Sequence, residues 1–152
     1  MIDREARDKL AESIRALVSG QITNYEFEAR VPDWSKDPAI KAVFNGGPWM
    51  LYDDFRTYRL RGAYKLVPEL KTEVARWVIF LKTDLEYEWP VQNFLQRLLH
   101  FLGNVCTVGL VGLLYRRRLE KHGDVNVWPF VKESDYKVAL EQPPYLSALV
   151  EK

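Results

Sequence analysis

Acidic side chains form the clearest clusters of chemically capable residues in this sequence. The segment DLEYEWP places three carboxylates at alternating positions, Asp84, Glu86 and Glu88. If the segment is extended, these side chains share one side of the chain and the apolar residues between them share the other. A second pair, Asp53 and Asp54, occurs in YDDF. Such groups can bind a basic partner or a metal ion, and two carboxylates can act as the acid and base of a hydrolase.

The spacing of these residues does not favour catalysis, because nothing in the sequence sets the separation that a hydrolytic pair needs. His100 lies in an apolar run and His122 precedes a glycine, so we expect a core residue and a helix-end residue. Cys106 lacks a nucleophile signature, and no cysteine or histidine pair has zinc-ligand spacing. We therefore predict no catalytic residue, no metal site and no cofactor. A carboxylate-dependent, metal-assisted enzyme remains the alternative.

Composition narrows the class of protein. Lysine and arginine number 22 and aspartate and glutamate 21 among 152 residues, whereas nucleic-acid proteins usually carry a clear basic excess. Contact with RNA or DNA would depend on the basic run RRRLEK at 116–121. The length suits one domain, 1–152. A single cysteine and an N-terminus without the apolar stretch of a secretory signal favour the cytoplasm.

Helical periodicity dominates the first half of the chain. Apolar residues at 6, 10, 14, 17 and 18 predict a helix that Asp3 caps and Gly20 ends. Thr23 followed by Glu26 is a capping box, which predicts a short second helix. Proline at the first helical position predicts three more helices, each with apolar residues following. They begin at Pro38 after the N-cap Asp37, at Pro48 to include YDDF, and at Pro68 to run through Leu81.

The second half centres on the uncharged stretch 98–115. We predict two helices, 91–102 and 105–121, separated by Gly103 and Asn104, with the second buried at the centre of the domain. A buried strand near 105–114 is the alternative and would make the fold α+β. A membrane span is a further alternative, although 98–115 is short for one. Ser134 is the expected N-cap of a last helix.

Tryptophan and proline occur together at the expected element boundaries. Trp34, Trp49, Trp89 and Trp128 each lie within two residues of a proline. Proline restricts the chain direction, and a neighbouring ring can fix that boundary to the core. We therefore expect Asp84–Trp89 to be an exposed acidic link anchored by buried Leu85, Tyr87 or Trp89.

Three stretches of the sequence, SGQITNYEFE, LYDDF and FLKTDLEYEWP, resemble parts of small single-domain bacterial proteins. That group includes immunity proteins, which block toxins delivered between cells. The stretches cover less than a third of the chain and contain no catalytic signature. The resemblance implies a binding role and transfers no functional residue.

The sequence thus predicts an all-α, compact multi-helix domain that binds a protein and carries out no reaction. The proposed partner is a basic toxin or effector, because clustered carboxylates offer charge complementarity. The expected partner-binding residues are Asp53, Asp54, Asp84, Glu86 and Glu88, with Trp89 as a central anchor. No membrane contact is expected, and the oligomeric state stays open.

Overall fold

The computed structural model describes residues 1–90, 117 and 119–141. Every regular element in this part of the chain is a helix, so the fold is all-α as predicted. The elements are α1 (Arg4–Val18), α2 (Asn24–Glu28), α3 (Pro38–Gly46), η1 (Pro48–Leu51), η2 (Gly62–Tyr64), α4 (Pro68–Lys82), η3 (Val125–Val127) and α7 (Glu133–Glu141). The predicted buried helix, its strand alternative near 105–114 and the 98–115 stretch lie outside the described residues.

Local capping sets the starts of the first three helices as predicted. The Asp3 carboxylate accepts a hydrogen bond from the Ala6 amide at 3.1 Å. Thr23 and Glu26 form the full capping box, in which each side chain bonds the other residue's backbone N–H. Asp37 caps α3. These side chains satisfy amide groups that have no partner within the helix.

The helix predicted to begin at Pro48 and include YDDF is wrong. Only the single turn of η1 forms, and the chain stays irregular up to η2. The buried side chain of Asn24 donates hydrogen bonds to the carbonyls of Asp53 and Arg56 and accepts one from the Tyr58 amide. These bonds replace the helical ladder, because one distant side chain satisfies the backbone groups.

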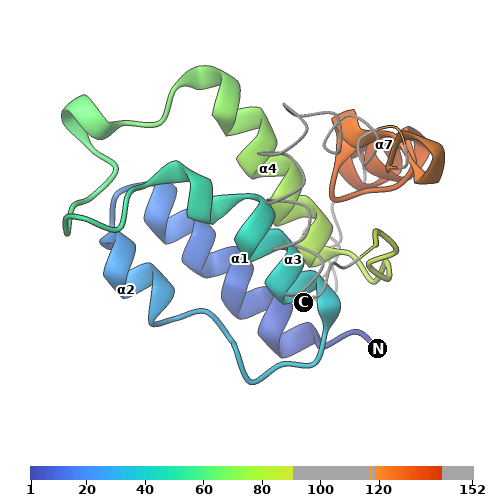
Figure 1. Ribbon diagram of the computed structural model, residues 1–152, viewed down its shortest axis with the longest axis horizontal. Helices are drawn as coiled ribbons and strands as arrows, with labels where there is room; N and C mark the ends of the chain where they lie inside the picture. Colours follow the sequence, from blue (N-terminus) through green and yellow to red (C-terminus); the bar gives the residue numbers. More distant parts are fainter. Residues whose placement is uncertain (91–116, 118, 142–152) are drawn as a thin grey trace, which may run out of the picture.

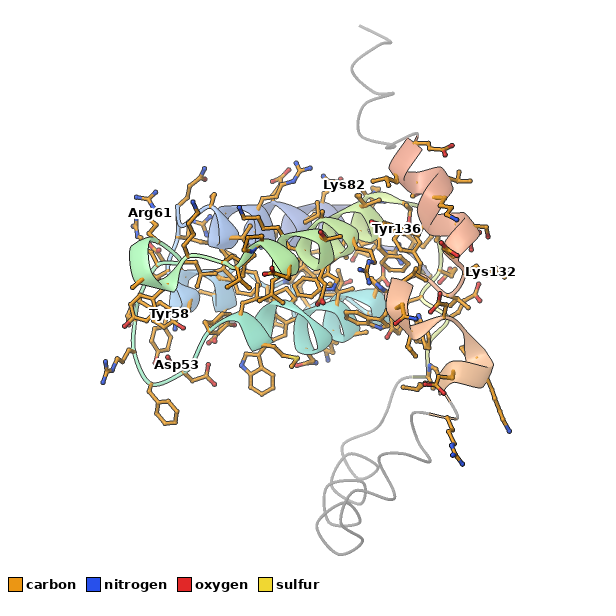
Figure 2. The ribbon with its side chains drawn as sticks, turned by 90° about the horizontal axis from the view of Figure 1, so that it is seen from above. Asp53, Tyr58, Arg61, Lys82, Lys132 and Tyr136 are labelled. Carbon is orange, nitrogen blue, oxygen red and sulfur yellow. The ribbon has the colours of Figure 1, made fainter. Side chains whose placement is uncertain are left out.

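Helix α1 is the centre of the described fold, since it packs on α4, α3 and α2 (Figure 1). Its apolar face is buried at Ala6, Leu10, Ile14 and Leu17, as the 3.6-residue period requires, and Val18 is partly buried. The residues that α1, α3 and α4 bury together include Leu10, Ile14, Leu17, Ile40, Val43, Val78 and Leu81. Helix α7 packs on α4 at one end, and the stretch that includes Asp53, Tyr58 and Arg61 lies at the other (Figures 1 and 2).

The last helix begins earlier than the sequence predicted. It starts at Glu133, so Ser134 lies inside the first turn and its hydroxyl bonds the Asp135 carboxylate at 3.2 Å. Ser134 is therefore not the N-cap. Among the described residues, no helix is long and apolar enough to cross a membrane.

Candidate binding site: an aromatic segment beside a basic groove

The acidic link after α4 is exposed, as predicted, and part of its charge is already paired. Asp84 lies 3.3 Å from the Arg4 guanidinium, and Glu86 lies 3.1 Å from the N-terminal ammonium group. Glu88 presents its carboxylate to solvent, and its backbone carbonyl lies 2.7 Å from the Nε2 atom of His122. Because these ion pairs are exposed, they add little stability. The carboxylates also remain accessible to a partner.

Trp89 is not on this surface. Its side chain is buried, and the indole N–H donates to the carbonyls of Pro129 and Phe130 at 3.0 and 3.1 Å. The prediction of Trp89 as a partner-binding anchor is therefore wrong, because its ring and its donor are both used within the fold. Trp89 instead anchors the acidic link to the core, the structural role expected of one of its apolar residues.

The two acidic clusters lie at opposite ends of the described fold. Figure 2 shows Asp53, Tyr58 and Arg61 at one end, with Lys82 and Tyr136 toward the other. The acidic link begins two residues after Lys82. The five carboxylates of the predicted site therefore do not form one surface.

Five exposed apolar side chains fall within residues 49–67, a stretch that we name the 49–67 segment. Phe55 is 92% exposed and Met50 79% exposed. Trp49, Tyr64 and Val67 are also exposed. Single exposed apolar residues are ordinary on protein surfaces, but five within one irregular segment suggest an interaction site.

Tertiary contacts hold this segment in place. The Tyr25 hydroxyl donates to the Asp54 carbonyl at 2.8 Å, and the Tyr58 hydroxyl accepts from the Asp53 amide at 2.9 Å. The rings of Tyr58 and Tyr64 lie 4.6 Å apart. Asp53 also accepts a hydrogen bond from the next-but-one amide within the turn. These contacts order the backbone before a partner arrives, which lowers the entropy cost of binding.

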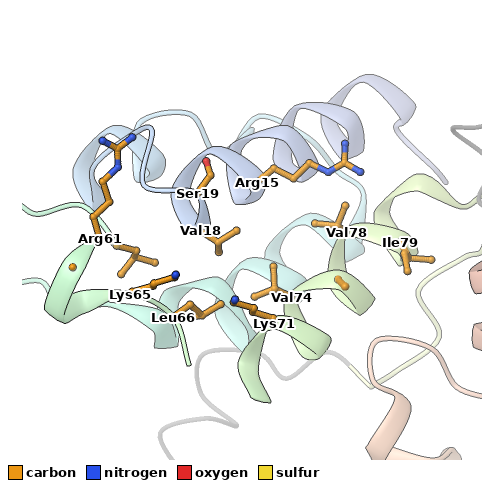
Figure 3. A pocket seen from close by; sticks show the side chains of 13 residues that line it. Arg15, Val18, Ser19, Arg61, Lys65, Leu66, Lys71, Val74, Val78 and Ile79 are labelled. Carbon is orange, nitrogen blue, oxygen red and sulfur yellow. The ribbon is translucent and has the colours of Figure 1, made fainter. Parts of the chain in front are cut away.

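A groove of about 630 Å³ opens beside the same segment, between α1, η2 and α4 (Figure 3). Its volume is in the range of natural ligand sites. The floor is aliphatic and comes from α1, from α4 and from the chain on either side of η2. These floor residues are Val18, Leu60, Leu66, Val74, Val78 and Ile79.

The rim of the groove carries only positive charge. Arg15, Arg61, Lys65 and Lys71 line it, and no carboxylate, histidine or cysteine is among its described lining residues. Figure 3 shows Arg15 and Arg61 toward opposite ends, with Lys65 and Lys71 between them. Within the described part of the chain, Arg61, Lys65 and Lys71 form no ion pair. We name this site the basic groove.

A glycine allows one wall of the basic groove to form. Gly20 follows α1 with φ of 68°, a conformation that other residues rarely adopt. A Cβ atom at this position would overlap the aliphatic stem of Arg61. The chain therefore turns tightly here, and Arg61 packs against the end of α1.

Sequence analysis missed the basic groove because its charges are far apart in the chain. Arg15 belongs to α1, while Lys71 belongs to α4. The basic and aromatic run RTYRLRGAYK at 56–65 was the available signal. Its first half, 56–60, falls at the end of the helix predicted from Pro48, which does not form.

The described residues include no metal-binding cluster. No group of three or more histidine, cysteine or acidic side chains in this part of the chain could hold a metal ion. Tyr52 is kept neutral, because burial and the nearby Glu28 carboxylate raise the pKa of its phenol. Comparison with protein-family models, with curated proteins and with solved structures finds no match to this chain.

Proposed function

We propose that this chain is a non-catalytic module that binds another protein, acting as a bacterial immunity protein that neutralises a toxin or effector in the cytoplasm. The observation that carries the proposal is the exposed apolar set on the 49–67 segment. Phe55 and Met50 are large, exposed and attached to a backbone that distant side chains hold in place. Ordered apolar anchors of this kind dominate the energy of protein interfaces.

The charges around these anchors are mixed. Asp53 and Asp54 flank Phe55 on one side, while Arg56 and Arg59 follow it, and all four are exposed. A polar rim around an apolar centre is the usual anatomy of a protein interface. Asp53 and Asp54 are therefore proposed as rim residues. The acidic link at the far end of the fold is proposed only as a separate contact.

The basic groove supports a binding role over catalysis. General acid–base chemistry needs a group that gains or loses a proton near neutral pH. The groove's described lining contains no histidine, carboxylate, tyrosine or cysteine, which are side chains that commonly take this role. Its charges are suited to holding an anionic group.

The first experiment is affinity capture from the native host with the purified chain as bait. The test variant combines Met50→Ser and Phe55→Ser, which removes two exposed anchors without touching the core. The matched control combines Val138→Ser and Leu140→Ser, two exposed apolar residues on α7 at the opposite end of the fold. We expect the wild type and the control to retain a partner that the test variant loses.

A captured partner is then purified and recombined with the chain, and titration calorimetry measures the binding affinity. Losing one hot-spot side chain typically costs at least about 2 kcal/mol of binding free energy. Co-expression then tests neutralisation, since the chain should protect cells from the partner and the test variant should not. Equal binding by the test variant, or capture of no partner together with turnover of a substrate, would defeat the proposal.

A further inference from the structure

We propose that the basic groove binds an acidic amphipathic helix presented by the partner protein. This inference rests on the proposed function and deepens it by naming the chemistry of the bound segment. It also reverses the sign that the sequence suggested. The carboxylates predicted to bind a basic partner are split between the two ends of the fold, whereas the groove gathers four cations around an apolar floor.

The floor of the groove suits an apolar helix face. Val74 and Val78 are one helical turn apart on α4, and Leu60 and Leu66 line the groove from the chain on either side of η2. An amphipathic helix presents side chains at i, i+3, i+4 and i+7 to such a groove. The aliphatic lining offers contact along the groove and few polar atoms that binding would leave without hydrogen bonds.

The distribution of charge selects a segment with several carboxylates. Arg15 and Arg61 lie toward opposite ends of the groove, and Lys65 and Lys71 lie between them (Figure 3). A fatty acid has one anionic group and would need cations at one end only. A helix with acidic residues on both flanks of its apolar stripe can pair with charges along the whole rim.

Single-stranded nucleic acid would also match the positive charge but not the floor. Sites of that class combine basic side chains with aromatic rings on which bases stack. The described lining of the groove contains aliphatic side chains and no aromatic ring.

The basic groove and the 49–67 segment share residues. Leu60, Arg61, Lys65 and Leu66 line the groove and belong to that segment, which also carries Phe55. One partner can therefore insert a helix in the groove and contact the exposed apolar anchors beside it.

The test uses a synthetic peptide as the probe. It is a capped helix of about 18 residues, roughly five turns, with leucine on one face and glutamate on both flanks. A matched peptide has lysine in place of every glutamate. Titration is followed by assigned amide NMR spectra of the full chain. We expect saturable shifts in residues 15–19, 60–66 and 71–79 with the acidic peptide and none with the basic one.

Charge reversal makes the test specific. Lys65→Glu combined with Lys71→Glu should weaken the acidic peptide by about tenfold or more and create binding of the basic peptide. The control combines Lys41→Glu with Lys132→Glu, which changes net charge equally at exposed positions outside the groove. The control should bind the acidic peptide like the wild type. Melting temperature verifies that each variant is folded.

Two further probes decide between classes of ligand. The probes are dodecanoate and a single-stranded oligonucleotide. The proposal is overturned in favour of one of these ligand classes if that probe shifts the NMR signals of the groove residues and the acidic peptide does not. Equal binding of the acidic peptide to wild type and to the charge-reversed groove also overturns it. The proposed function is tested separately by Met50→Ser and Phe55→Ser, which lie outside the groove. A captured partner whose binding does not depend on the groove would contradict this inference but not the proposed function.

Discussion

Arg7 and Asp37 form a fully buried ion pair that joins α1 to the start of α3. Arginine Nε donates to one carboxylate oxygen at 2.6 Å and Nη2 donates to the other at 3.3 Å. Arg7 also donates to the carbonyls of Thr83 and Leu85, at 3.1 and 2.7 Å, just beyond α4. One side chain therefore ties three helices together, and the predicted N-cap of α3 is also the counterion in the core.

Breaking this pair from either side should strongly destabilise the fold. Arg7→Met or Asp37→Ala leaves one buried charge without its partner, which costs about 3–5 kcal/mol of unfolding free energy. The measurement is urea denaturation followed by circular dichroism. Lys137→Met is the control, because it breaks an exposed i,i+4 pair with Glu133 and should cost less than about 0.5 kcal/mol. Equal costs for both changes would contradict the structural role of the buried pair.

Stability should fall in acid partly through Asp37. Burial by itself would raise the pKa of this carboxyl, but the Arg7 guanidinium and the amides of Asp3 and Ala39 hold it below its usual value. A lowered pKa in the folded state adds stability above the unfolded pKa of about 3.9, and that stability is lost as pH falls through the folded value. The advantage of wild type over Asp37→Asn should therefore shrink below about pH 4. A constant difference from neutral to strongly acidic pH would contradict this assignment.

Substitutions within the acidic link should differ in their effect on the free energy of unfolding, according to whether the side chain is exposed or buried. Replacing Asp84, Glu86 and Glu88 together by alanine removes exposed charges and should change the unfolding free energy by less than about 1.5 kcal/mol. Trp89→Ala removes a buried ring and leaves two carbonyls without their donor, which costs about 3–5 kcal/mol. Both variants are compared by thermal and urea unfolding. A large loss in the triple variant would show that the carboxylates hold the link in place.

Two glycines with positive φ form a matched pair. Gly62 has φ of 58°, and a Cβ atom added there would meet open space, so Gly62→Ala should cost only the backbone strain, about 1–2 kcal/mol. Gly20→Ala has comparable strain and also displaces the Arg61 stem, so it should cost more. Unfolding free energies of the two variants test this order. Equal costs would show that Arg61 moves aside freely.

Much of the helical framework was accessible from sequence because its signals are local. Asp3, Thr23 with Glu26, and Asp37 with Pro38 each act within one helical turn. A cap of this kind is encoded by neighbouring residues and needs no distant partner. The start of α4 at Pro68 and its apolar period were readable for the same reason.

The segment after Pro48 shows where local signals fail. Proline followed by apolar residues favours a helix, but Asn24 supplies hydrogen bonds to the backbone around Asp53 and Tyr58 from another element. No local pattern within the segment specifies those bonds. The placement of Trp89 was ambiguous in the same way, because a tryptophan beside proline fits both a surface anchor and a core anchor until its hydrogen-bond acceptors are known.

The sequence by itself determined the all-α class, the caps of the first helices and the presence of an exposed acidic link after α4. Only the tertiary structure decided which charges act together. It separated Asp53 from the acidic link and brought Arg15 near Lys71 across the basic groove. The physical reason is that caps and helical periods depend on residues a few positions apart, whereas a binding surface depends on how whole helices pack.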